Sequence, residues 1–191
     1  MPRLTNTRSK ILELAQRLLQ HRGFHGFSYR HLAEALGVKT AAIHYHFKTK
    51  GELGIELVSH IRGWFQQWAA DADSRIASPM ARLDAFYEMH AKFLDKDSAS
   101  PYGVLEAEYA TLPDSMRGEV RVLASEIHGW IARTLRQGAD AGVLSFRGDA
   151  DDQALAVGAA VQGALLISRA FGAERYRAVI AQLKRSMEAQ E

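Results

Sequence analysis

Between residues 28 and 50, apolar and polar side chains recur with the spacing of two short helices joined by a tight turn. The first helix follows Ser28, whose hydroxyl can accept a hydrogen bond from the free N–H groups of a first helical turn. Gly37 follows that helix and readily takes the left-handed backbone conformation that ends one. The expected common core of the two helices consists of Leu32, Ala33, Leu36, Val38, Ile43 and Phe47. The pattern predicts a helix-turn-helix whose second helix, with small and donor-bearing side chains on its free face, suits the major groove of DNA.

The rest of the chain is also dominated by apolar residues at helical spacing. A first helix is expected from Thr5 or Thr7 to Arg22. Later helices are expected over about residues 50–77, 79–94 and 104–111, from 114 or 115 to about 142, from 149–152 onward and from about 173 to the C-terminus. Residues 95–103 are polar and turn-rich, which predicts a surface loop. No useful length of sequence alternates with period two, so the predicted fold is all-α, with a three-helix N-terminal head and a larger helical body.

The helix expected after Asp149 is rich in alanine and glycine, and such small side chains let a second helix approach closely. Together with its long neighbours, it resembles half of a four-helix bundle that a second copy of the chain could complete. The longest nearly apolar run, residues 154–167, lies in this helix. The run contains Gln162 and is too short to span a bilayer, so we expect a buried helix and no membrane partner.

Composition narrows the class of protein. The 191 residues are 47% hydrophobic and 24% charged, which is ordinary for a soluble globular chain. There is no cysteine, so disulfides and thiolate metal sites are excluded. The N-terminal residues contain no apolar segment of the kind found in secretory signals, which favours a cytoplasmic location.

Charge is distributed unevenly along the chain. Residues 1–50 contain nine basic and two acidic residues, a net charge of +7, whereas residues 51–191 contain 15 basic and 20 acidic residues, a net charge of −5. A basic head on a mildly acidic body is typical of a nucleic-acid-binding module, although solvated surface or an anionic membrane would also fit charge alone. We therefore expect a DNA-binding domain over residues 1–50 and an effector-binding and dimerisation domain over residues 51–191.

The N-terminal third resembles the TetR family of transcriptional repressors. The matching segments are ILELAQRLLQHRGF and FSYRHLAEALGVKTAAIHYHFKTKGEL, of which the end, residues 44–50, is the most specific part. Residues 162–169 resemble the penultimate helix of one subgroup of TetR-like regulators. The resemblance implies a homodimer, held by the C-terminal helices, that binds a palindromic operator in double-stranded DNA and is released by a small-molecule effector.

The same resemblance assigns roles within the head. Five residues lie where the family reaches base edges: Arg30, Lys39, Thr40, Ala41 and His44, with Ala42 a weaker candidate. Five lie where the family holds phosphates: Ser28, Tyr29, Tyr45, His46 and Lys50. Many relatives begin the second helix with Ser or Thr where this chain has Lys39, so Thr40 is an alternative cap that would then be less free to contact a base.

Aromatic and polar residues of the body suggest an effector cavity, because ligand sites between helices are mostly apolar with a few polar groups. The candidates are Trp64, Trp68, Phe86, His90, Phe93, Tyr109, His128, Gln162 and Arg169. The alternative for each aromatic residue is that it packs in the hydrophobic core or at the dimer interface. The effector is expected to be a small, partly apolar molecule.

Catalytic and metal-binding patterns are missing from the sequence. It contains no nucleophile elbow, phosphate-binding glycine loop or HExxH motif, so an enzyme is not expected. His44 and His46 point in different directions on a helix and cannot hold one metal ion, and no cofactor is implied. The alternative function is a helical small-molecule-binding or protein-interaction protein without sequence-specific DNA binding.

Overall fold

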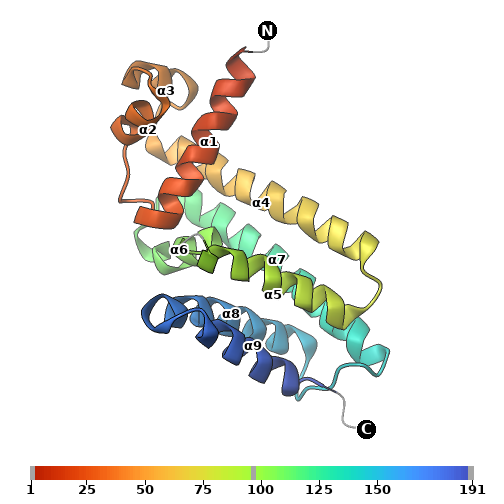
Figure 1. Cartoon of the computed structure of the whole chain (residues 1–191). Coiled ribbons are helices and arrows are strands. Elements are labelled where there is room, and N and C mark those ends of the chain that lie inside the picture. The colour runs from red at the N-terminus through yellow and green to blue at the C-terminus, as the bar shows by residue number, and fades with distance from the viewer. Residues whose placement is uncertain (1–2, 96–97, 189–191) are drawn as a thin grey trace. The chain divides into compact units, whose positions relative to one another are not determined.

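The computed structural model describes residues 3–95 and 98–188 and confirms the all-α prediction (Figure 1). Within these ranges the β pairing is limited to one isolated antiparallel bridge between Leu144 and Glu188. The helices are α1 (Arg3–Arg22), α2 (Tyr29–Leu36), α3 (Thr40–His46), α4 (Lys50–Arg75), α5 (Pro79–Asp95), α6 (Pro101–Ala107), the short 3-10 helix η1 (Tyr109–Thr111), α7 (Asp114–Asp140), α8 (Ala150–Phe171) and α9 (Glu174–Arg185).

The chain forms two compact units, and α4 and α7 contribute residues to both. The first unit consists of Met1–Trp64 and Pro101–Leu123, and the second of Phe65–Ser100 and Ala124–Glu191. The predicted boundary after residue 50 divides the chain by function, between DNA binding and effector binding, and it stays a prediction.

The first unit has a core built on α1, α2 and α3. Its fully buried side chains include Ile11, Leu19, Leu32, Ile43 and Phe47. Leu32, Ile43 and Phe47 were expected there from their helical spacing, and α1 supplies the other two. The burial of these side chains fixes the pairing of short helices that are too short to be stable alone.

Two glycines end helices of this unit in the left-handed region, as predicted. Gly23 follows α1 with φ +75°, and Gly37 follows α2 with φ +66°. Val38 differs from its prediction, because its side chain is 39% exposed and lies outside the core. The reason is the turn itself: the backbone N–H of Val38 donates to the carbonyl of Ala33 at 3.0 Å, which fixes the corner through backbone contacts without a side-chain plug.

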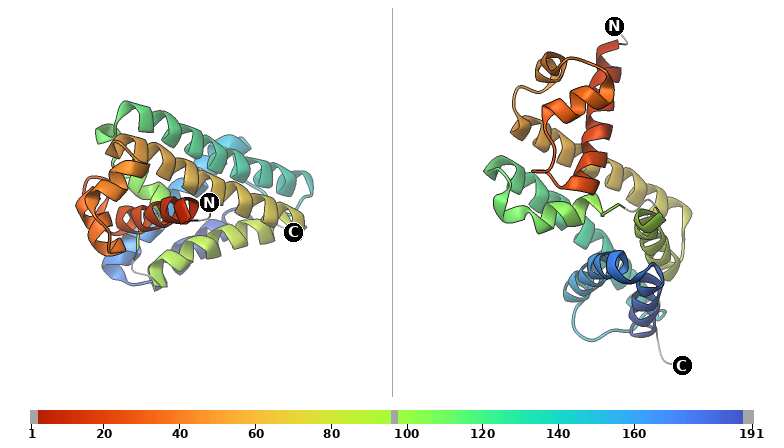
Figure 2. Two further views of the ribbon diagram at one scale, coloured as in Figure 1. Left: turned by 90° about the horizontal axis from the view of Figure 1, so that it is seen from above. Right: turned by 60° about the vertical axis from the view of Figure 1, so that its left-hand side comes forward.

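The second unit combines α5, α8 and α9 with residues 65–75 of α4 and 124–140 of α7. Helices α8 and α9 pack against each other as a hairpin, and α8 also packs against α5 (Figure 2). The hydroxyl of Tyr176 on α9 donates to the carbonyl of Tyr87 on α5 at 2.7 Å, which joins these two helices. Phe86 and Trp130 are almost fully buried between the helices of this unit.

Helix α8 is only partly buried, in contrast to the prediction. Its buried side includes Ala154, Val157, Val161, Ala164 and Leu165. The helix also exposes four large apolar side chains: Leu155, Leu166, Ile167 and Phe171. Among the described helices, α8 is the one whose length and apolar composition would also suit a membrane span, with 39% of its most apolar window buried. The spacing of apolar residues along α8 did not indicate which of them other helices of the same chain would bury.

The loop expected over residues 95–103 is shorter than predicted. Helix α5 extends to Asp95 and α6 begins at Pro101, where proline suits the first turn of a helix. Ser98 and Ser100 are buried, so the described part of this connection is not a surface loop. Residues 96 and 97 lie outside the described ranges.

Candidate nucleic-acid interface

Helices α2 and α3 form the predicted helix-turn-helix (Figure 1). Ser28 is the N-cap of α2, and its backbone N–H donates to Nδ1 of His31 at 3.2 Å. The N-cap of α3 is Lys39, which makes no side-chain cap bond, and Thr40 is the first helical residue. The alternative in which Thr40 caps the helix is therefore not adopted, and the Thr40 side chain is exposed on the first turn.

The residues predicted to contact base edges share one property: the side chains of Arg30, Lys39, Thr40, Ala41 and His44 are all exposed, whereas Ala42 is half-buried. Arg30 Nε donates to Glu34 at 2.9 Å, one turn along α2. Both side chains of this pair are well exposed, and such a pair contributes only about 0.3–0.5 kcal/mol. Arg30 can therefore exchange Glu34 for another partner at little cost.

His44 is oriented by two neighbours. Its ring packs edge-on against Tyr29, with centroids 4.6 Å apart, and its Nδ1 lies 3.4 Å from the carbonyl of Lys48. Because a carbonyl only accepts, this contact requires the proton on Nδ1 and leaves Nε2 as an acceptor in the neutral ring. Nε2 is then the nitrogen left to face a base.

The residues predicted to contact phosphates differ in exposure. Tyr45 is 73% exposed and Ser28 is exposed, whereas His46 is half-buried. Tyr29 is buried, and within the described chain its hydroxyl has no hydrogen-bond partner. Burial, with a smaller contribution from the charge of Glu52, raises the pKa of Tyr29 to about 12. The structure thus gives Tyr29 the role of supporting the His44 ring, and its phosphate contact stays a prediction.

Lys50 points into the first unit. Its ammonium donates to the carbonyls of Phe24 and Phe27, each at 2.5 Å, and lies 4.6 Å from the centroid of each of their rings. Burial lowers the pKa of Lys50, partly offset by the negative charge of Glu108. In this position the ammonium holds the loop between α1 and α2, and its phosphate contact stays a prediction. The backbone N–H groups at the start of α4 remain the predicted phosphate contact.

Glu108 was not found by sequence reasoning. Its carboxylate accepts from the backbone N–H of Phe24 at 2.7 Å, across 84 residues of sequence. A side chain at Gly23 would collide with this carboxylate, which explains the close approach of the two segments there. Glu108 therefore ties the loop before α2 to the end of α6 within the first unit. No local pattern marks this residue, because its partner is a backbone group distant in the sequence.

The nine residues proposed for an effector cavity are divided between the units. Trp64 and Tyr109 belong to the first unit, and Trp64 is half-exposed. In the second unit, four candidates form a continuous row of ring contacts: Trp68 to Phe86 (6.0 Å), Phe86 to His90 (4.4 Å) and His90 to Phe93 (6.0 Å). Trp68 also packs on Trp130 at 5.1 Å. These contacts place the four side chains against one another within the second unit, with Phe86 and His90 buried and Trp68 and Phe93 half-buried.

The remaining candidates in the second unit are His128, Gln162 and Arg169. Phe93 and Arg169 line a small hollow of about 120 Å³, together with Ser168, whose buried hydroxyl has no partner within the described residues. His128 is half-buried, with its ring beside Gly158, and Gln162 is also half-buried. A single cavity formed by all nine residues stays a prediction.

His90 is the buried polar member of the row. Only 5% of it is exposed, and its Nδ1 lies 2.9 Å from the carbonyl of Phe86. Burial, only partly opposed by this hydrogen bond, lowers the pKa of His90 to about 4. His90 is therefore neutral at physiological pH and presents Nε2 as an acceptor. In the part of the chain that the structure describes, no three His, Cys, Asp or Glu side chains are grouped so as to hold a metal ion.

Comparison with known proteins agrees with this geometry. Residues 11–57 match the family model for bacterial regulatory proteins of the tetR family. The chain is 27% identical over 167 residues to the HTH-type transcriptional regulator LmrA of Bacillus subtilis (strain 168), which covers 85% of this chain and 86% of LmrA.

Solved structures extend the likeness to the whole chain. A TetR-family transcriptional regulator from Agrobacterium tumefaciens is 28% identical, with a TM-score of 0.92 over 97% of this chain and 100% of that one. A putative transcriptional regulator from Saccharomonospora viridis, solved in complex with choline, shares the fold with 24% identity and a TM-score of 0.81, over 97% of this chain and 100% of that one.

Proposed function

Because the chain belongs to the TetR family of transcriptional regulators, we propose that it is a homodimeric repressor that binds a palindromic operator and leaves it when a small molecule binds. As a member of this family it is a DNA-binding regulator and not an enzyme. The observation that carries the proposal is the exposed face of α3, where Lys39, Thr40 and His44 offer hydrogen-bonding groups free of the core. We place the protein in the cytoplasm, where its DNA would be.

The free face of α3 is suited to a major groove. Lys39 and Thr40 lie at the N-terminal end of α3, and His44 lies one turn further along the same helix. Side chains of this kind discriminate base pairs by hydrogen bonds to their major-groove edges, at about 1–3 kcal/mol for a good bidentate pair. The +7 charge of residues 1–50 supplies the sequence-independent attraction to phosphates.

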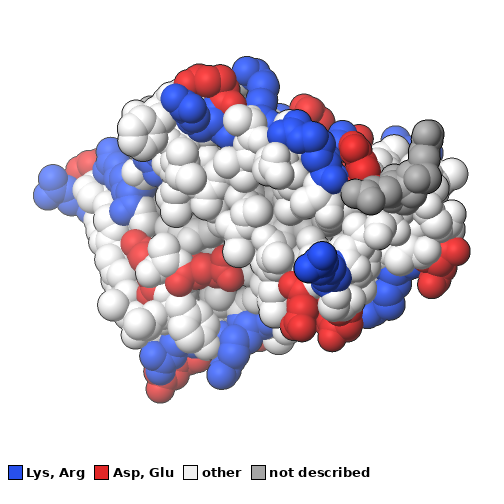
Figure 3. All heavy atoms as spheres, turned by 90° about the horizontal axis from the view of Figure 1, so that it is seen from below, with Lys and Arg blue, Asp and Glu red and all other residues white. Residues whose placement is uncertain are grey.

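A dimer with two-fold symmetry would bind an operator with the same symmetry, that is, a palindrome. Leu155, Leu166, Ile167 and Phe171 are exposed on α8, and a surface of this kind on a folded protein marks an interaction site. Figure 3 shows the molecule from the side of α8 and α9, where charged side chains lie mainly around a broad uncharged area. Pairing this surface with the same surface of a second copy gives a symmetric dimer, and its two heads would bind half-sites related by the same symmetry.

Release by an effector requires a ligand that binds one conformation better than the other. The aromatic row through Trp68, Phe86 and His90 supplies apolar surface and one buried acceptor for such a ligand. The choline bound by the Saccharomonospora viridis protein supports the idea that this fold takes small organic molecules. A coupling of about 1–3 kcal/mol between effector and operator would change DNA affinity by about 5- to 150-fold.

The proposal is tested by selecting genomic DNA fragments on the purified full-length protein and eluting them over a salt series. We expect recovery of one palindromic motif with a steep salt dependence. A variant carrying Thr40→Ala and His44→Ala is the matched control, since both side chains are exposed and their loss should abolish enrichment of that motif without unfolding the head. Weak, sequence-independent recovery by the natural chain would contradict the proposal and favour a helical ligand-binding or interaction protein.

A further inference from the structure

The ring of His44 is exposed on α3, yet two neighbours in the first unit hold it in one orientation. On one side it packs edge-on against the buried ring of Tyr29 from α2, with centroids 4.6 Å apart. On another side its Nδ1 lies 3.4 Å from the carbonyl oxygen of Lys48, in the connection between α3 and α4. The ring is thus oriented before any DNA is bound.

The Lys48 carbonyl is itself held by the start of α4. The backbone N–H of Lys48 donates to Oε2 of Glu52 at 2.9 Å, and the backbone N–H of Glu52 donates to the hydroxyl of Thr49 at 3.1 Å. Reciprocal bonds of this kind fix the chain where a helix begins. The backbone on both sides of the Lys48 carbonyl is therefore held in place, and the oxygen that faces Nδ1 of His44 is part of a rigid corner.

This corner determines which nitrogen of His44 carries the proton in the neutral ring. A carbonyl oxygen only accepts hydrogen bonds, so it favours the tautomer with the proton on Nδ1. The other tautomer would place the lone pair of Nδ1 against the lone pairs of the Lys48 oxygen. In the favoured tautomer Nε2 has a lone pair and no proton, so His44 presents an acceptor to a ligand of α3.

An acceptor at this place discriminates among the four bases. In the major groove adenine and cytosine offer an exocyclic amine that donates, whereas guanine and thymine offer only acceptor atoms. Lys39, at the start of the same helix, differs from His44 because an ammonium has only donors. We propose that His44 selects an amine-bearing base, adenine or cytosine, at one position of each half-site. This inference rests on the proposed binding of a palindromic operator.

The first experiment locates the proton without DNA. A long-range nitrogen–proton NMR correlation spectrum of the labelled full-length protein, at about pH 8 where imidazoles are neutral, distinguishes the two tautomers. The signals of His44 are those that disappear in His44→Phe. We expect the proton on Nδ1, and a proton on Nε2 would overturn the proposal whether or not an operator is found.

The second experiment removes the amine from the base. The position that His44 reads is the one at which His44→Phe, which keeps a ring beside Tyr29, loses its base preference. The base there is replaced by the analogue that lacks only the amine, purine for adenine or pyrimidinone for cytosine. This replacement should weaken binding by the natural chain about three- to tenfold more than binding by His44→Phe, because only the natural chain loses a hydrogen bond.

His21→Phe is the matched control, because His21 is an exposed histidine in the last turn of α1. It should respond to the analogue as the natural chain does. The proposal is overturned if His44→Phe changes no base preference, if it responds to the analogue as the natural chain does, or if guanine or thymine occupies the position. Recovery of no operator motif at all would instead contradict the proposed function, and the inference with it.

Discussion

Lys50 shows how a charged side chain can stabilise a loop from within. Its ammonium satisfies two backbone carbonyls and lies over the rings of the same two residues, Phe24 and Phe27. Hydrogen bonds from a charged donor contribute more than neutral ones, and a carbonyl left without a donor in a partly buried place has a cost. Lys50 thus fixes the loop that positions the start of α2.

We expect Lys50→Met to lower the free energy of unfolding by about 1–3 kcal/mol, because both carbonyls lose their donor while the methylene packing is largely kept. Urea denaturation followed by circular dichroism measures this change. Lys48→Met is the control, since the Lys48 side chain is exposed and the contacts at that position come from its backbone. Equal stability of the two variants would contradict this stabilising role of Lys50.

His90 makes the stability of the protein depend on pH. Its pKa is about 4 in the folded chain and 6.5 in the unfolded chain, so between these values the unfolded chain binds a proton that the folded chain does not. Stability from this group is fully present above about pH 6.5 and is lost as the pH falls toward 4. We expect it to account for about 2 kcal/mol of destabilisation between pH 7.5 and pH 5.

The measurement is urea denaturation at both pH values for the natural chain and for His90→Gln. The variant should lose about 2 kcal/mol less on acidification, whatever its absolute stability. His21→Gln, which changes an exposed histidine of α1, should behave as the natural chain does. An unchanged pH dependence in His90→Gln would mean that other groups account for the acid sensitivity.

At the scale of elements, α3 separates contacts that select sequence from contacts that add affinity. We expect Thr40→Ala or His44→Ala to change which operator bases are preferred, with losses of about 1–3 kcal/mol at the affected positions. Tyr45→Phe removes one phenolic donor, so it should weaken all sequences alike. Binding to a panel of single-base operator variants measures both effects, and a changed sequence preference in Tyr45→Phe would contradict this division.

The elements of the head could be predicted from sequence because their signals are local. Gly37 closes α2 in the left-handed region, and Ile43 and Phe47 fall on one helical face, as their positions indicate. Val38 and Lys50 could not be placed in this way. The exposure of Val38 and the inward position of the Lys50 ammonium depend on which backbone groups lie near them. The spacing of residues along the chain does not contain this information.

For the whole molecule, the exposed apolar residues of α8 lead to a prediction about assembly. Leu166 is 64% exposed, and Leu166→Glu would place a charge in the proposed interface. We expect this variant to sediment as a monomer and to lose most of its affinity for a two-half-site operator, while the natural chain sediments as a dimer. Ala139→Glu, an exposed position of α7, is the control and should stay dimeric. A Leu166→Glu dimer would place the interface elsewhere.

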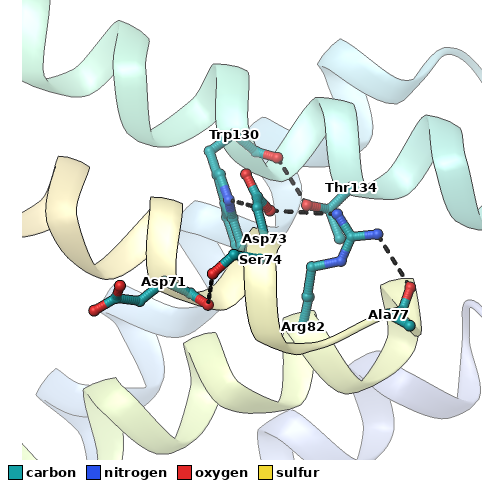
Figure 4. A network of polar contacts seen from close by, with 7 residues as sticks. All are labelled: Asp71, Asp73, Ser74, Ala77, Arg82, Trp130 and Thr134. Carbon is teal, nitrogen blue, oxygen red and sulfur yellow. Dashed lines mark hydrogen bonds and ion pairs between the residues drawn. The ribbon is translucent and has the colours of Figure 1, made fainter.

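The sequence by itself determined the helical class, the helix-turn-helix, the basic head and the resemblance to a family, because hydrophobic period, capping residues and a short specific motif are all properties of neighbours in the chain. Only the tertiary structure decided which residues far apart in the sequence contact each other. It joined Glu108 to Phe24 and turned Lys50 inward. It also left apolar side chains of α8 uncovered and joined Asp73 to Trp130 (Figure 4). These features arise where segments far apart in sequence meet, and their energies depend on burial and hydrogen-bond partners that no local pattern records.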